Sequence, residues 1–169
     1  MELFNSYDWS KFACRININA PIQQIYDAWT KPALLEKWFL CEAKFIPKDE
    51  EARRADDYIK KNDSYHWRWY GFSKQTIEKG SVMEANGTDS LQFTFSGDTL
   101  VTVIIKTEEA ENVVELWQEN IPKTDMGKVD YHVYGMMSWT FYLTNLKSIL
   151  EGGIDLRNKN EELKNMVNA

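Results

Sequence analysis

The sequence contains few of the residues that reaction centres and metal sites usually need. It has two cysteines, Cys14 and Cys41, with no CxxC spacing, and two histidines, His66 and His132, with no spacing that metal sites use. A GxSxG motif and the glycine-rich loops GxGxxG and GxxxxGK(S/T) are also absent. We therefore expect no catalytic nucleophile, no metal ion and no cofactor, and we expect the two cysteines to be reduced, buried thiols.

Basic clusters and long apolar runs are missing as well. Lys and Arg number 20 against 26 Asp and Glu, so the formal net charge is -6, which makes nucleic acid and anionic membrane surfaces poor partners. The uncharged stretch 131–146 is shorter than the roughly 20 apolar residues that a membrane span needs. The first ten residues show no basic region followed by an apolar run, so they do not resemble a signal peptide. We expect a cytoplasmic protein that does not insert into membranes.

Aromatic residues, by contrast, are abundant. They make up 14% of the 169 residues and include 7 Trp, within a hydrophobic fraction of 43% and a charged fraction of 27%. Hydrophobic and charged fractions of this size are ordinary for a globular protein, and the length fits a single domain over residues 1–169. Aromatic rings can fill a core or line a cavity, so the composition leaves both roles open.

The residue pattern predicts one strand, two short helices and then a succession of strands. Residues 11–18 alternate between apolar and polar side chains, as in a half-buried strand. Two helical patterns follow, separated at Lys31-Pro32 because the residue before a proline avoids the helical region. About six strand signals come next, with a strong hairpin signal at Asn86-Gly87. Strands joined in succession by short turns favour an antiparallel sheet.

The last predicted element is one long, apolar helix. It begins at Thr124 or Asp125, either of which can cap it, and runs to about Glu151, where Gly152-Gly153 ends it. An antiparallel sheet has one face to bury, and no other predicted element is apolar enough to cover that face. We therefore predict an α+β fold in which the sheet wraps around the C-terminal helix.

The two halves of this helix differ in the kind of side chain they carry. The C-terminal half has Leu143, Leu146 and Leu150 at helical spacing, as in ordinary packing. The N-terminal half has flexible or small residues, among them Gly135 and Met136, and methionine adapts to irregular apolar surfaces. We predict that the helix contacts the sheet closely at its C-terminal end and stays apart at the other, which leaves an apolar cavity. The alternative is that Met and Gly solve a packing problem.

Two segments and the element order between them resemble a known family. "INAPIQQIYDAWTKPALLEKWF" and "WTFYLTNLKSILEGG" are similar to the START-like superfamily (SRPBCC, the helix-grip fold), in the branch of homologues of the activator of the heat-shock chaperone ATPase. The resemblance extends from about Phe12 to Leu150. It implies a seven-stranded antiparallel sheet, two short helices after the first strand, and an elongated apolar cavity under the C-terminal helix. The positions that carry it are Ala20-Pro21, Trp29, Pro32, Trp38, Trp139, Leu143 and Leu146.

Together, the helix pattern and the resemblance favour non-catalytic binding of a small apolar or lipid-like ligand between the sheet and the helix. Gln118 is the polar candidate among the wall residues, because it shares a strand face with Val114 and Leu116. The predicted ligand-binding residues are Trp38, Trp67, Trp69, Phe93, Phe95, Val103, Ile105, Gln118, Val133, Met136, Met137 and Thr140.

Two other functions stay open. The resemblance implies, as an alternative, a stress protein that contacts a chaperone and activates its ATPase through the outer surface. A small cyclase or hydrolase is the third hypothesis, and its candidate acid/base residues are Glu84, Gln118 and Arg68. A monomer and a homodimer are equally compatible with the sequence.

Overall fold

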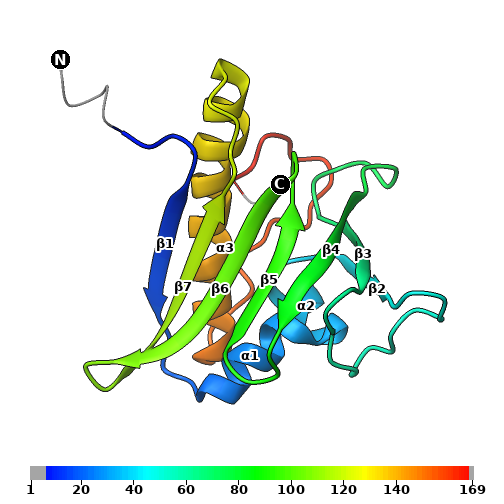
Figure 1. The fold of residues 1–169 in the computed structure, drawn as a ribbon, viewed down its shortest axis with the longest axis vertical. Coiled ribbons are helices and arrows are strands. Elements are labelled where there is room, and N and C mark those ends of the chain that lie inside the picture. The colour runs from blue at the N-terminus through cyan, green and yellow to red at the C-terminus, as the bar shows by residue number, and fades with distance from the viewer. Residues whose placement is uncertain (1–6, 168–169) are drawn as a thin grey trace.

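The protein folds into one antiparallel sheet with three helices against it (Figure 1), and the structure, a computed structural model, describes residues 7–167. The seven strands lie in the order β1-β7-β6-β5-β4-β3-β2, which confirms the predicted helix-grip arrangement of a seven-stranded sheet and a long C-terminal helix. The strands are β1 Phe12–Asn17, β2 Glu42–Ile46, β3 Ser64–Arg68, β4 Glu78–Ala85, β5 Ser90–Phe95, β6 Thr99–Glu108 and β7 Glu111–Glu119. The helices are α1 Ile22–Thr30, α2 Pro32–Trp38 and α3 Tyr134–Leu150, the last preceded by a π-helical stretch, Gly127–Val133.

The β4–β5 hairpin forms where the Asn86-Gly87 pair predicts it. The Asn86 side-chain oxygen accepts hydrogen bonds from the backbone N–H groups of Thr88, Asp89 and Ser90, each at 3.0 Å. Gly87 has a φ of +83°, a conformation that costs glycine nothing and other residues a great deal. The turn is therefore favoured by local chemistry, and a 2.8 Å hydrogen bond from the Gly87 N–H to the Tyr26 hydroxyl connects it to α1.

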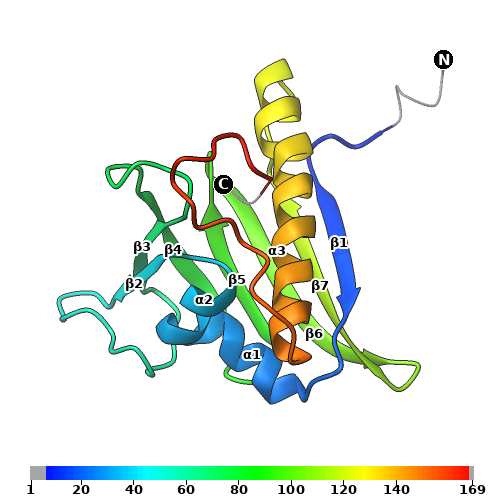
Figure 2. The same cartoon turned by 180° about the vertical axis from the view of Figure 1, so that it is seen from behind.

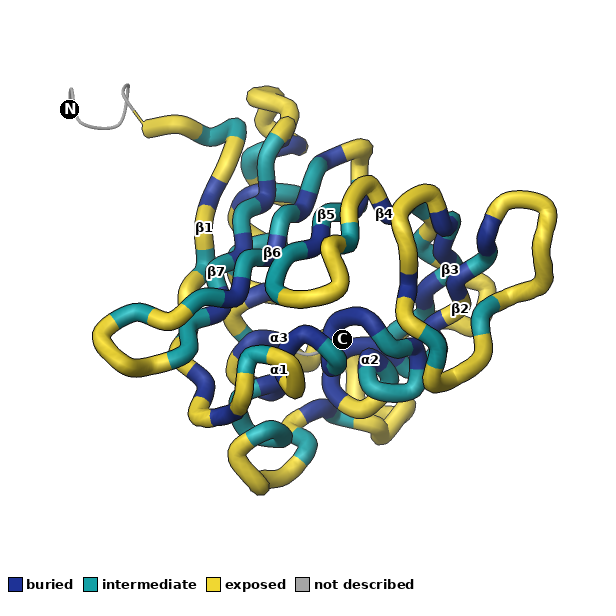
Figure 3. The backbone as a smooth tube through the Cα atoms, turned by 60° about the horizontal axis from the view of Figure 1, so that its bottom comes forward, coloured by how far each residue is buried: buried dark blue, intermediate teal, exposed yellow. Residues whose placement is uncertain are grey.

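The long helix lies across the inner face of the sheet, with α1 and α2 beside its C-terminal end (Figure 2). Its C-terminal half is tightly packed, because Leu143 and Leu146 are almost fully buried. Trp38 of α2 fixes the two short helices by donating a 2.9 Å hydrogen bond to the Ala28 carbonyl oxygen. Buried segments gather where the helices meet the sheet, whereas the hairpin loops are exposed (Figure 3).

After α3 the chain turns back and runs beside the helix (Figure 2). Arg157 anchors this tail: its guanidinium group donates 2.9 Å hydrogen bonds to the carbonyl oxygens of Leu40 and Glu36 and pairs with Asp155 at 2.8 Å. Asn145 on α3 accepts a 2.8 Å hydrogen bond from the N–H of Leu156. The first part of the tail, residues 155–157, is thus held against the core by hydrogen bonds and an ion pair and not by helix formation. Among residues 7–167, no helix is both long enough and apolar enough to pass through a bilayer.

Candidate ligand-binding cavity

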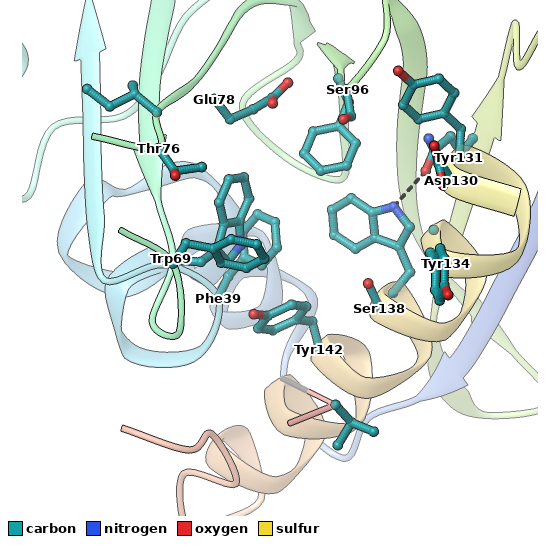
Figure 4. A pocket seen from close by; sticks show the side chains of 17 residues that line it. Phe39, Trp69, Thr76, Glu78, Ser96, Asp130, Tyr131, Tyr134, Ser138 and Tyr142 are labelled. Atoms are coloured by element: carbon teal, nitrogen blue, oxygen red, sulfur yellow. Dashed lines mark hydrogen bonds between the residues drawn. The ribbon is translucent and has the colours of Figure 1, made fainter. Parts of the chain in front are cut away.

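A cavity of about 340 Å³ lies between the sheet and the N-terminal half of α3 (Figure 4), and we call it the inner cavity. The sheet side contributes Trp69, Phe95 and Gln118, and α3 contributes Trp139 and Tyr142 among others. The predicted opening between helix and sheet is therefore present in the structure, and it lies at the predicted end of the helix.

Aromatic rings make a continuous wall along the cavity. The ring of Phe39, just after α2, stacks on Trp139 with centroids 5.1 Å apart and meets Tyr142 edge-on at 5.0 Å. Phe95 lies 5.3 Å from Trp139 and 6.2 Å from Trp69. Because each ring is held by its neighbours, the wall is largely formed before any ligand enters.

Gln118 lines the cavity, but its amide group is already engaged. Its oxygen accepts a 2.9 Å hydrogen bond from the indole N–H of Trp139, and its nitrogen donates a 3.0 Å bond to the hydroxyl of Thr99. Only 1% of Gln118 is exposed. The residue therefore positions Trp139 in the wall and is poorly placed to orient a ligand itself.

Gly135 allows the helix to come close to the sheet beside this pair. A Cβ atom at position 135 would lie 3.3 Å from the ring of Phe12 and 3.4 Å from the Gln118 side-chain oxygen. Both contacts are close, so a larger residue would push the helix outward. The glycine that the sequence analysis assigned to a loosened helix thus permits a close contact next to the cavity.

Five of the predicted ligand-binding residues belong to the core and do not line the inner cavity. Each of the five is at most 2% exposed and packs against other core side chains. They are Trp38, Trp67, Phe93, Val103 and Ile105. Trp67, for example, stacks on Tyr65 with centroids 3.7 Å apart. Alternation along a strand identifies the inward face, but it does not tell which inward residues meet a cavity and which meet other side chains.

Four further predicted residues lie on a different face of α3, which corrects the expected orientation of the helix. Val133, Met136, Met137 and Thr140 line an outer groove of about 620 Å³, together with Trp9 and others. Successive helical residues are turned by about 100°, so Gly135, Trp139 and Tyr142 share the inner face while these four are rotated away from it. The π-helical stretch before α3 changes the phase only of the residues it contains, which among these four means Val133.

The candidate acid/base residues are not brought together. Glu84 forms a surface ion pair with Lys61, and Arg68 pairs with Glu42 at 2.7 Å. Strand alternation alone would place Glu84 on the same face as the inward Val82, but a register shift between these two residues turns it outward. Only Gln118 of the three reaches the inner cavity.

The histidines and cysteines also lie apart from the inner cavity. His132 is 2% exposed and is held between the Tyr7 hydroxyl, at 2.9 Å, and the Trp9 carbonyl oxygen, at 3.0 Å. Cys14 and Cys41 are free, partly buried thiols whose pKa values are raised by burial. In the described part of the chain, no three His, Cys, Asp or Glu side chains come together in a way that could hold a metal ion.

The sequence analysis missed several polar groups of the inner cavity. Glu78, at the start of β4, pairs in register with Trp67 and so shares its inward face. Counting back in twos from the buried Val82 would have identified it. Ser138 and Tyr134 come from the first turns of α3, and Asp130 comes from the π-helical stretch. Burial raises the pKa of Tyr142, so its phenol stays neutral and can donate a hydrogen bond.

Comparison with known proteins places this fold and cavity in a family. Residues 19–151 match the model of the family described as Activator of Hsp90 ATPase homolog 1-like protein. The chain belongs to this family. No curated protein matches the chain in sequence.

Solved structures agree with the family's fold. The protein SSP2350 from Staphylococcus saprophyticus is 15% identical with a TM-score of 0.67, over 87% of this chain and 96% of that one. The Aha1 dimer from Colwellia psychrerythraea is 19% identical with a TM-score of 0.65, over 85% and 97%. The AHSA1-like protein from Aeromonas hydrophila is 17% identical with a TM-score of 0.59, over 83% and 92%. Identities this low establish a shared fold only.

Part of the cavity's surroundings lies outside the family match. The match ends at residue 151, and the tail that follows brings Val167 to the inner cavity. Val167 also borders the outer groove, so the tail lies at the N-terminal half of α3 between the two hollows. In this chain the inner cavity is therefore bordered in part by a residue beyond the matched segment.

Proposed function

We propose that this protein binds a small, largely apolar or lipid-like molecule in the inner cavity and does not transform it chemically. The observation that carries the proposal is the open space of about 340 Å³, which falls within the range of about 300–1,000 Å³ typical of ligand sites. Burial of apolar ligand surface, at about 25 cal/mol per Å², would supply the binding free energy. Glu84 and Arg68, two of the three residues predicted for a cyclase or hydrolase, lie outside the cavity and so do not support that alternative.

The proposal needs no second chain, because the cavity is lined by residues of one chain. A monomer is therefore sufficient for binding, and a homodimer is compatible with it. We place the protein in the cytoplasm, since a reducing compartment suits the free thiols of Cys14 and Cys41.

Intrinsic tryptophan fluorescence provides the test. Trp69 and Trp139 both line the inner cavity, so a bound ligand should change their emission. We would titrate a panel of fatty acids, sterols, flavonoids and aromatic amines. Saturable changes with a micromolar Kd would support the proposal, and no response to any member of the panel would reject it.

Two matched variants locate the binding site. Ser138→Phe adds a ring inside the inner cavity, whereas Thr144→Phe adds the same ring to the outer groove on the same helix. Both positions are exposed to solvent or to the hollow they line, so neither change should prevent folding. Loss of binding in Ser138→Phe alone assigns the ligand to the inner cavity, and loss in Thr144→Phe alone contradicts the proposal.

Family membership favours a second candidate function. The family's description refers to activation of the Hsp90 ATPase, so the chain could act as a stress protein on a heat-shock chaperone. The test is the ATPase rate of the chaperone with and without a molar excess of this protein. An increased rate that survives in Ser138→Phe would assign this activity to the outer surface, and an unchanged rate would argue against it.

A further inference from the structure

The charged and titratable groups that line the inner cavity are all acidic or phenolic. Glu78 and Asp130 supply carboxyl groups, and Tyr131, Tyr134 and Tyr142 supply phenols. Among the described residues, no Lys, Arg or His lines this cavity. An anionic ligand would therefore meet carboxylates with no cation to offset them, and charge complementarity favours the opposite sign.

Glu78 is the carboxyl group that the cavity buries. It is half-buried on the inward face of β4, opposite Trp67, and no side chain in residues 7–167 forms a hydrogen bond or an ion pair with it. Burial raises the pKa of Glu78, and the nearby Asp98 raises it further. A carboxyl group without a partner in an apolar site gains more from a cation than a solvated one does, because the group has already lost much of its hydration.

The aromatic wall is the second feature that suits a cation. Figure 4 shows Glu78 and Trp69 on one side of the open space and Tyr134 and Ser138 on the other. Ring faces carry negative potential and attract ammonium groups, most strongly when the ring is that of tryptophan. Trp69, which is partly exposed, thus adds to the attraction that Glu78 exerts, whereas Trp139 is 2% exposed and has Phe39 stacked on its ring.

We propose that the ligand of the inner cavity carries a positively charged nitrogen, and that its charge pairs with Glu78 while its apolar part contacts the aromatic wall. The ligand class is an aromatic or alicyclic amine of a size that fits the cavity. This inference rests on the proposed function, since it names the class of molecule that the inner cavity binds. Fatty acids and other apolar anions are correspondingly poor ligands.

Three compounds with one ring system and different charge test the proposal: 2-(2-naphthyl)ethylamine, 2-(2-naphthyl)ethanol and 2-naphthylacetate. Their affinities would be measured by isothermal titration calorimetry at pH 7. We expect the amine to bind about tenfold or more tighter than the alcohol, and the alcohol to bind tighter than the acid.

Two charge-matched variants separate local pairing from the protein's overall charge. Glu78→Gln should raise the Kd of the amine about tenfold and change the Kd of the alcohol by less than about twofold. Glu84→Gln is the control, because it removes the same charge from the same strand at an exposed position outside the cavity. It should leave the order of the three affinities unchanged.

The outcomes distinguish this inference from the proposed function. If the alcohol binds in the inner cavity but the amine binds no more tightly, or if the acid binds best, the proposed function stands and the cationic ligand class is overturned. If Glu84→Gln weakens the amine as much as Glu78→Gln does, the preference comes from net charge and the role of Glu78 is overturned. If none of the three compounds binds while a member of the fluorescence panel does, the cationic ligand class is overturned and the proposed function stands; if the panel also gives no response, both fail.

Discussion

Replacing Gln118 with methionine tests whether one buried amide holds the wall of the inner cavity. Methionine has nearly the length and volume of glutamine but neither accepts nor donates a strong hydrogen bond. The change would remove the acceptor for the indole N–H of Trp139, at 2.9 Å, and the donor to Thr99, at 3.0 Å. Thr99 keeps other partners, because its hydroxyl also donates to the Phe95 carbonyl oxygen. The indole N–H of Trp139 would lose its hydrogen-bond acceptor.

The cost follows from these two losses. One net hydrogen bond contributes about 1 kcal/mol, and leaving a buried donor unsatisfied costs about 1–3 kcal/mol. The free energy of unfolding should therefore fall by about 2–4 kcal/mol, which for a domain of this size lowers Tm by about 4–16 °C. Trp139 should also become free to move within the wall, so ligand binding should weaken.

Urea unfolding followed by circular dichroism measures the change in stability, and Gln92→Met is the matched control. Gln92 lies on the half-buried outer face of β5 and donates a single 2.9 Å hydrogen bond to Thr102. Its replacement should cost about 0.5–1 kcal/mol, because the groups left behind can bond to water.

A double-mutant cycle with Trp139→Phe isolates the contact. Once the indole N–H is gone, Gln118→Met should cost about 1–2 kcal/mol less than in the parent protein. The reasoning is refuted if Gln118→Met costs no more than Gln92→Met, or if the cost is the same whether position 139 is Trp or Phe.

Three further predictions concern positions around the cavity. Gly80→Ala should destabilise the fold by about 1–3 kcal/mol in thermal unfolding, because a Cβ there would lie 2.4 Å from the Tyr65 hydroxyl; a cost near zero would show that the ring moves freely. Glu78→Gln should raise the free energy of unfolding at pH 7 and make it fall less steeply with rising pH. The pKa of Glu78 is raised on folding, so the stability that its protonated form provides is present below the unfolded-state pKa and is lost as pH rises through the folded-state pKa. For Asp155 the free energy of unfolding changes with pH in the opposite direction, because the pKa of this carboxyl group is lowered on folding. Burial opposes the charge of Asp155, yet Arg157 and Lys159 hold its pKa well below the usual range, so its stabilisation is present above about pH 4 and is lost as pH falls. Hydrogen-exchange protection factors in residues 152–167, corrected for the intrinsic rate at each pH, should therefore fall below about pH 4. Arg157→Ala should show low protection already at pH 7, with Lys164→Ala unchanged as control.

The helix-grip architecture could be predicted because its signals are local. Alternation in residues 11–18, the break at Lys31-Pro32 and the Asn86-Gly87 turn each depend on neighbouring residues, and each reappears as a strand, a helix boundary or a hairpin. A cavity is present at the predicted end of α3, but not for the predicted reason, because Met136 and Met137 face the outer groove and Gly135 permits a close contact with the sheet.

The membership of the cavity was predicted less well, for reasons that lie beyond sequence spacing. The outward orientation of Met136 and Thr140 follows from which side of the regular helix α3 packs on the sheet, and the outward turn of Glu84 depends on a register shift in β4. The first is decided by contacts between distant residues, and the second interrupts the two-residue period, so that a pattern continued through it names the wrong face. Trp67 and Phe93 face inward as expected, but neighbouring rings fill the space in front of them.

By itself, the amino-acid sequence determined which segments become strands and helices, their order, and the presence of an apolar helix over one sheet face, since hydrophobic period and turn chemistry act between near neighbours. Only the tertiary structure decided which face of α3 meets the sheet and that the Gln118 amide group bonds to Trp139. It also decided that Glu78 lies in the aromatic cavity without a side-chain partner among the described residues, and that the polar tail returns to the edge of that cavity. Those outcomes depend on contacts between residues far apart in the chain, and their energies are set by burial that no local pattern records.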